Sequence, residues 1–222
     1  MPVTLQYAHS MRSEFPELAS CNLQIESIHP DADVSDVIAR FHSVAAVRLA
    51  ASSEGEFPEI LAWRRAFAKM GCKPTQYRCA SEALLRRFRK EGRLPRLHPL
   101  VDLCNAASIA YAIPIAVFDA ARIEGTLEVR PATGEEIYET FSGTAESPEP
   151  GEIIFADDSG RAHARRWTNR QSGHSAVRSE TVAAFIVAEA LHARAVEDLS
   201  SLMAELRRVL LTAWPASKLV TA

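Results

Sequence analysis

The sequence predicts an α+β fold: a mixed or antiparallel β-sheet core flanked by helices, with a C-terminal helical segment. Two observations lead to this prediction. Segments with apolar residues at helical spacing dominate the first half of the chain, and short strand-like segments separated by Gly, Pro and Asp dominate the stretch after residue 125. The length of 222 residues suits one sizeable domain, and no repeat or low-complexity tract divides it. We therefore expect a single domain over residues 1–222, with 191–222 as a C-terminal helix extension.

The helices and the strand of the first half are predicted from the spacing of apolar residues and from Pro and Gly at the helix ends. "SCNLQIESI" alternates as a strand over about residues 20–28, and helical spacing of apolar residues follows over 33–51. Two further helices are expected over 58–71 and 81–92, because Pro tends to open a helix and Gly to end one. Another helix opens at Pro99.

The second half begins with four strand-like pieces: "TLEVRPA", "GEEIYETF", "GEIIFAD" and "RAHARRWTN". Residues 179–212 are then expected to form two helices, broken near Glu197–Asp198. Within them lies an apolar stripe of Leu199, Leu202, Leu206 and Val209. That stripe predicts either a cover for the sheet or the seam of a homodimer.

Composition narrows the class of protein. A net charge of -3 and a pI near 6.2 lack the basic excess of a dedicated nucleic-acid binder, so we expect no DNA partner, and an RNA contact would need a local basic patch. The four cysteines form no CxxC pair, which favours free thiols in a reducing compartment. Neither a signal peptide nor an apolar run of bilayer-spanning length is present, so the expected location is cytoplasmic, away from membranes.

Several common site types have no signature here. The seven histidines are scattered without metal-ligand spacing, the nine glycines form no phosphate-binding loop, and there is no GxSxG motif. We therefore expect neither a metal nor a cofactor.

A polar cluster interrupts the apolar helix that starts at Pro99. It is "VDLCN", which holds Asp102, Cys104 and Asn105. Asn105 is either a structural amide or a polar group at the floor of a pocket. Cys104 could act as a nucleophile, although a buried Cys on an apolar helix is more often inert.

Two other clusters are rich in arginine. "RRWTNRQSGHS", residues 165–175, either binds a phosphate, a carboxylate or a base, or forms a solvated loop anchored by Trp167. Eleven of the 25 basic residues lie between positions 64 and 96, which predicts either a polyanion-binding face or solvated helix faces.

Three segments resemble a known family. "HPLVDLCNAASIAYAIPIAVFDAARIEGTLEVRPATGEEI", "GEIIFADDSG" and "SGHSAVRSET" look like the tRNA-editing (B-three/B-four) domain of the phenylalanyl-tRNA synthetase beta subunit. That domain shows "VDVTNY", "GQPLHAFD", "LVIAD" and "GGEHSGV..ET" in the same order. The resemblance spans roughly residues 60–190, and the chain looks like a freestanding version of the domain.

The resemblance implies a pocket with altered residues. The family's Thr-Asn pair corresponds to Cys104 and Asn105, and its His before "AFD" corresponds to Ala116, with Asp119 retained. Its Glu aligns with Gly173, beside His174. In the family that His and Glu recognise the tyrosine hydroxyl, so specificity for tyrosine is not expected. The small residues that line the family's pocket fall near Trp167 and Thr168, which reduces the expected pocket volume.

The resemblance therefore implies a trans-editing deacylase that hydrolyses the ester of a mischarged aminoacyl-tRNA. The alternatives are a non-catalytic module that binds RNA, aminoacyl-tRNA or an amino acid, and a small-molecule amidase or esterase. Hydrolysis is assigned to Asn105, Arg170 and Asp119. The substrate pocket is assigned to Cys104, Ala116, Trp167, Thr168 and His174, and tRNA binding to Arg78, Arg86, Arg87 and Arg93.

Overall fold

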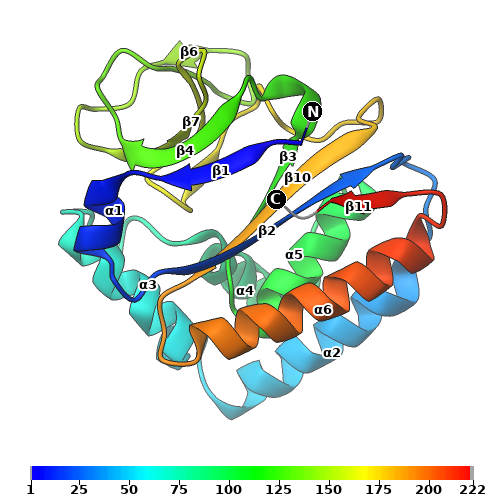
Figure 1. The fold of residues 1–222 in the computed structure, drawn as a ribbon. Coiled ribbons are helices and arrows are strands. Elements are labelled where there is room, and N and C mark those ends of the chain that lie inside the picture. Colours follow the sequence, from blue (N-terminus) through cyan, green and yellow to red (C-terminus); the bar gives the residue numbers. More distant parts are fainter. Residues whose placement is uncertain (1, 221–222) are drawn as a thin grey trace.

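The computed structural model describes residues 2–220, which form an α+β fold with two sheets, as the sequence predicts (Figure 1). The four-stranded sheet is antiparallel and has the order β11-β2-β10-β3. Its strands are β2 (Ala19–Glu26), β3 (Ile115–Asp119), β10 (Ala183–Ala190) and β11 (Lys218–Val220). Figure 1 shows this sheet between a layer of helices and the larger sheet.

The larger sheet is mixed and has the order β1-β4-β7-β8-β5-β6, with β9 paired to β8. The pairs β1–β4 and β5–β8 are parallel, and the remaining pairs are antiparallel. Its strands are β1 (Thr4–Tyr7), β4 (Thr126–Pro131), β5 (Ile137–Glu139), β6 (Ala145–Glu146), β7 (Ile153–Ala156), β8 (Arg161–Arg165) and β9 (Arg170–Gln171). The four strands expected between residues 126 and 169 are confirmed as β4, β5, β7 and β8.

The helices begin and end close to their sequence signals. They are α1 (His9–Glu14), α2 (Ser35–Ala51), α3 (Pro58–Lys69), α4 (Ala80–Glu91), α5 (Pro99–Tyr111) and α6 (Ala195–Ala213), with short 3-10 turns η1 (Glu54–Glu56) and η2 (Ala120–Arg122). Pro58 and Pro99 occupy first-turn positions, where their missing N–H costs no hydrogen bond. Gly92 ends α4 in the left-handed region at φ 69°, which glycine adopts without a Cβ clash. None of the helices within residues 2–220 combines the length and apolar composition needed to cross a bilayer.

The prediction of two helices over 179–212 is wrong in its first part. Residues 183–190 form β10, and α6 then runs unbroken past Glu197 and Asp198. β10 is one of the two inner strands of its sheet and is buried on both faces, so its sequence "AAFIVAEA" lacks the alternation that marks a half-exposed strand. The expected C-terminal helix is confirmed as α6, but the segment also contributes β11 to the sheet.

Two apolar cores lie on opposite faces of the four-stranded sheet. Ala184, Ile186 and Ala188 of β10 face α5 and α6, whereas Phe185 and Val187 face the larger sheet and α3. The leucine stripe of α6 belongs to the first core: Leu199, Leu202, Leu206 and Val209 are all buried within the chain. Because this stripe already covers the sheet, it does not present an exposed seam for a dimer.

Buried ion pairs stabilise the larger sheet. Arg165 at the end of β8 is only 5% exposed and donates two hydrogen bonds of 2.8 Å to Glu152 and one of 2.8 Å to Glu146. The Glu152 side chain is only 7% exposed, so removal of the Arg165 guanidinium would leave its carboxylate with only the more distant Arg166, at 3.8 Å, as a counter-charge.

We therefore expect Arg165→Met to lower the free energy of unfolding by about 3–5 kcal/mol, measured by chemical denaturation. Arg40→Met is the matched control, because the Arg40–Glu205 pair is largely solvated and its loss should cost less than about 1 kcal/mol. Equal losses in the two variants would contradict the stabilising role of the buried pair.

Candidate functional site

A small cavity lies between the two sheets, beside the segment that joins β8 to β9. Its volume is about 60 Å³, which is room for a few water molecules or a small aliphatic group. Its walls come from the start of β3, from β7, β8 and β10, from the first residue of α4, and from residues 167–171. Ala116, Trp167, Thr168 and Arg170, four of the residues predicted for the site, line this one cavity.

A strained turn places Trp167 inside the protein. Arg166 and Trp167 have φ values of 46° and 58°, a left-handed conformation that non-glycine residues adopt at a cost of roughly 1–2 kcal/mol each. The turn is held by a hydrogen bond of 2.7 Å from the Trp167 N–H to the Ile153 carbonyl. The indole is fully buried and packs edge-to-face on Phe15 and Trp63, with ring centroids 4.9 Å apart in both pairs. Burial of this large ring offsets the backbone strain.

The cavity also contains a buried carboxyl group that the sequence interpretation missed. Glu189 of β10 is 2% exposed, and its Oε1 accepts hydrogen bonds from Trp167 Nε1 (2.9 Å) and from the Tyr7 hydroxyl (2.8 Å). Burial raises the pKa of Glu189 to about 7, although the Trp167 and Tyr7 hydrogen bonds partly oppose this rise. A carboxyl group that titrates near neutral pH can exchange a proton with a bound substrate or water.

Two further polar groups shape the cavity wall. Thr168 Oγ1 is buried and has no hydrogen-bond partner among the described residues, so it remains able to bond to a ligand. Gln171 donates from Nε2 to the Val117 carbonyl at 2.7 Å, which fixes its side chain against β3. Arg170 is half-solvated: it pairs with Glu146 at 3.1 Å and stacks over the ring of Tyr138. The cavity therefore combines one titratable carboxyl, one unpaired hydroxyl and an apolar indole.

The other predicted residues of the site lie elsewhere. Cys104 belongs to the core on the helical side of the sheet, and burial raises the pKa of its thiol to about 12, which disfavours a nucleophilic thiolate. Asn105, the next residue of α5, is half-buried. Asp119 accepts hydrogen bonds from the Ala121 N–H (3.0 Å) and the Thr181 hydroxyl (2.8 Å), which fix the chain at the end of β3.

His174 lies beside another histidine outside the cavity. Its ring centroid is 5.9 Å from that of His163, and burial is the main cause that lowers the pKa of His174. The His163 side chain is itself hydrogen-bonded to Asp157 at 3.1 Å. The family resemblance assigned His174 to the same pocket as Trp167 and Thr168, but His174 does not line the cavity that those two residues share.

The arginines predicted to bind tRNA divide into two groups. Arg78 pairs with Glu82 and Arg86 pairs with Glu54, and both of these acids are almost fully buried. Arg64 and Arg89 complete the same two ion-pair clusters. Arg87 pairs only with the exposed Glu91, and Arg93 forms no salt bridge within residues 2–220. Part of the basic segment is thus neutralised by acids inside the helix layer.

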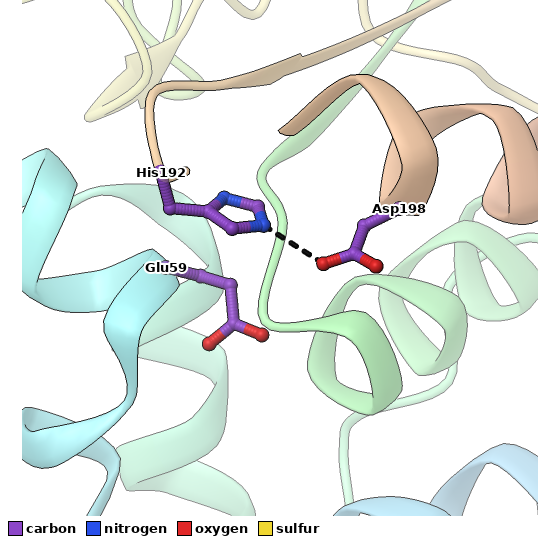
Figure 2. A group of neighbouring side chains, drawn as sticks. All are labelled: Glu59, His192 and Asp198. Carbon is purple, nitrogen blue, oxygen red and sulfur yellow. Dashed lines mark hydrogen bonds and ion pairs between the residues drawn. The ribbon is translucent and has the colours of Figure 1, made fainter. Parts of the chain in front are cut away.

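A different set of side chains could be considered for a metal. Glu59, His192 and Asp198 come from α3, the segment before α6, and α6, and their ligand atoms lie within 4.8 Å of one another (Figure 2). His192 Nε2 is hydrogen-bonded to Asp198 at 2.9 Å, and both oxygens of Glu59 accept from Arg48 Nη2 at 2.8 and 2.9 Å. A cation would have to compete with the Arg48 guanidinium for Glu59. We therefore infer that Glu59, His192 and Asp198 hold α3 against α6.

The missed residue, Glu189, had one sequence signal. It is the only charged residue in the run "AAFIVAEALH", and an acid in a buried apolar segment needs partners or a function. The helical interpretation of 179–212 gave it no place near Trp167. Glu189 reaches the cavity because β10 pairs with both β2 and β3, and its N–H bonds to the Pro114 carbonyl at 3.4 Å, next to the cavity wall.

Comparisons with known proteins agree on one family. The family model described as "B3/4 domain" matches residues 62–204. A phenylalanine–tRNA ligase beta subunit from Nocardia farcinica (strain IFM 10152) is 35% identical over 77 residues, which cover 35% of this chain and 9% of that protein. The match thus takes in less than a tenth of the curated relative's length.

A solved structure has a similar fold. An N-terminal fragment of the phenylalanyl-tRNA synthetase beta subunit from Pyrococcus horikoshii superimposes with a TM-score of 0.55 at 9% sequence identity. The alignment covers 99% of this chain and 50% of that fragment. At this identity the likeness shows the fold alone.

The pKa of Glu189 predicts a pH-dependent stability. The folded chain retains this proton up to about pH 7, whereas the ordinary pKa of a glutamate is 4.5. Between these values the folded state binds more protons, so the contribution of Glu189 to the free energy of unfolding falls as the pH rises. From roughly pH 5 to pH 8, the free energy of unfolding of Glu189→Gln should therefore rise by about 2–3 kcal/mol relative to that of wild type, measured by denaturant unfolding.

Glu17→Gln is the control for this measurement, because Glu17 is exposed and its side chain bonds to no other described residue. A stability difference between Glu189→Gln and wild type that stays constant with pH would contradict a raised pKa at Glu189.

Proposed function

Because this chain belongs to the B3/4 domain family, we propose that it hydrolyses the ester bond of a mischarged aminoacyl-tRNA in the cavity beside Glu189. The observation that carries the proposal is a buried carboxyl group with a pKa of about 7 in the wall of that cavity. The curated relative is the beta subunit of a phenylalanine–tRNA ligase, which supports a tRNA ester as the substrate class.

The proposed reaction uses Glu189 as a general base. Both of its hydrogen bonds end on Oε1, so Oε2 is the oxygen that takes a proton from the attacking water. The resulting hydroxide adds to the ester carbonyl, and the tetrahedral intermediate then expels the ribose oxygen. That oxygen receives the proton back from Glu189, which regenerates the carboxylate. The Thr168 hydroxyl, which is buried without a hydrogen-bond partner among the described residues, is proposed to donate a hydrogen bond to the developing oxyanion.

The cavity volume supports a small amino acid as the substrate. About 60 Å³ is far less than an aromatic side chain needs, and the Trp167 indole occupies the adjoining space. The proposed substrate therefore carries a small side chain rather than that of tyrosine or phenylalanine. Arg78 is proposed to approach the acceptor-stem phosphates, because its carbonyl bonds to Asn169 of the cavity wall at 2.7 Å.

The same small volume also favours a second candidate function. A module that binds aminoacyl-tRNA or a free amino acid without hydrolysis needs the polar groups of the cavity but does not need space for an attacking water beside the ligand. The deacylation experiment separates the two functions.

The test is a deacylation screen with correctly and wrongly charged tRNAs, in which loss of the ester is followed over time. We expect wild type to hydrolyse one mischarged pair selectively, and Glu189→Gln to reduce the rate by roughly 10²-fold or more, since Gln cannot accept the proton. Glu17→Gln is the control for loss of one negative charge and should retain full activity.

Asn105→Ala distinguishes the two proposed positions of the site. If hydrolysis depends on Asn105 and not on Glu189, the site lies on α5 as the family resemblance implies, and the Glu189 mechanism is wrong. If wild type hydrolyses no pair at all, the binding module is the better description.

Trp167 provides a test of substrate size. Trp167→Ala should widen the cavity and admit esters with larger side chains, at a cost of about 3–5 kcal/mol in the free energy of unfolding. Trp167→Phe is the intermediate variant, because it keeps an aromatic ring but loses part of the indole volume and the hydrogen bond to Glu189. Relative rates with small and large aminoacyl esters measure the effect; an unchanged preference in the folded Ala variant would show that Trp167 does not set the size limit.

A further inference from the structure

A second cavity lies on the helical side of the molecule. It has a volume of about 640 Å³, within the range of small-molecule sites, and opens between α2, the C-terminal half of α4 and the loop that leads to α5. We call it the arginine groove, because Arg87, Arg93 and Arg96 line it together with the apolar residues Ile38, Leu94 and Pro95. None of these residues lines the cavity beside Glu189.

The charges of the groove differ from those of the rest of the basic segment. Arg93 and Arg96 are exposed and form no salt bridge with any residue between 2 and 220. Arg87 pairs with Glu91 at 3.1 Å, but both side chains are nearly half exposed, so this pair is weak and can exchange for another anion. By contrast, the arginines nearer the start of α4 are held by buried acids.

The loop that carries Arg93 and Arg96 is fixed at both ends. Gly92 closes α4 with a hydrogen bond of 2.8 Å from its N–H to the Phe88 carbonyl. At the other end, Asp102 accepts from the Leu97 N–H at 2.8 Å, and His98 caps the first turn of α5. The two arginines are thus presented on an anchored backbone, which lowers the entropy lost when they bind a ligand.

The opposite wall of the groove, formed by α2, is largely apolar. Ile38 and His42 lie one turn apart on α2, and the His42 ring packs on Phe88 with centroids 4.8 Å apart. Burial lowers the pKa of His42, so the imidazole is neutral near pH 7 and adds no charge to this wall. Guanidinium groups facing an apolar wall suit a ligand with one phosphorylated end and one planar or apolar end.

We propose that the arginine groove binds a phosphate-bearing ligand of nucleotide size. Arg93 and Arg96 hold the phosphate, with Arg87 released from Glu91, and the base or sugar lies against Ile38, His42 and Pro95. Two acids also line the groove: Asp102 Oδ1 accepts from the Leu97 N–H, and Glu91 is the ion-pair partner of Arg87. The three arginines outnumber them, so the groove keeps a net positive charge. Such a phosphate can belong to an RNA strand or to a free nucleotide. This inference does not depend on the proposed hydrolysis of aminoacyl esters.

The experiment compares two probes on the full chain. An uncharged acceptor-stem minihelix ending in CCA is titrated by fluorescence anisotropy at several salt concentrations, and AMP is titrated by calorimetry. The test variant is Arg93→Gln/Arg96→Gln. The control is Arg194→Gln/Lys218→Gln, which removes two exposed positive charges from other elements.

We expect the test variant to lose at least about tenfold in affinity for the minihelix, with a salt slope that is shallower by roughly 0.7–0.9 for the one phosphate that the two arginines hold. The control should bind as wild type does. Loss of AMP binding with unchanged minihelix binding would support the groove and identify a free nucleotide as its ligand.

The proposal is overturned if wild type binds neither probe, or if the test variant and the control lose affinity equally. Because both probes lack an aminoacyl ester, a failure of the deacylation screen does not affect this result. Both variants alter exposed side chains, and a thermal melt of each confirms that the fold is retained.

Discussion

The burial of one carboxyl group within an apolar strand is the constraint on which the centre of this structure depends. Glu189 lies among the buried residues of β10, and a buried acid needs hydrogen-bond donors from elsewhere in the chain. Tyr7 supplies one donor from β1 and Trp167 supplies the other from the turn after β8. The carboxyl therefore links the two sheets and fixes the indole that limits the cavity.

That arrangement explains why a strained turn persists at Trp167. Two consecutive left-handed residues are stable only where surrounding contacts determine their conformation. Here the indole is held by Phe15, Trp63 and Glu189, which come from three separate parts of the chain. Backbone strain and titratable buried groups both concentrate at functional sites, and here both lie at the cavity beside Glu189.

The sequence predicted most helices well and the centre of the fold poorly. Pro58, Gly92 and Pro99 act locally, so the bounds of α3, α4 and α5 could be read within a residue or two. β10 could not, because a strand buried on both faces shows no alternation and "AAFIVAEALHARAVEDL" continues into a true helix. The family resemblance placed Trp167 and Thr168 near a pocket, but the partner of Trp167 depends on non-local pairing that no local pattern contains.

The pairing of β2 with β10 has a consequence for synthesis of the chain. β2 lies near the amino end, and its first partner strand follows roughly 160 residues later, with β11 later still. At typical translation rates that interval is roughly ten to thirty seconds. During this time both backbone edges of β2 lack the partners they have in the finished sheet. Until β10 and β11 have left the ribosome, both edges of β2 therefore carry unpaired backbone groups that can pair with strands of other chains.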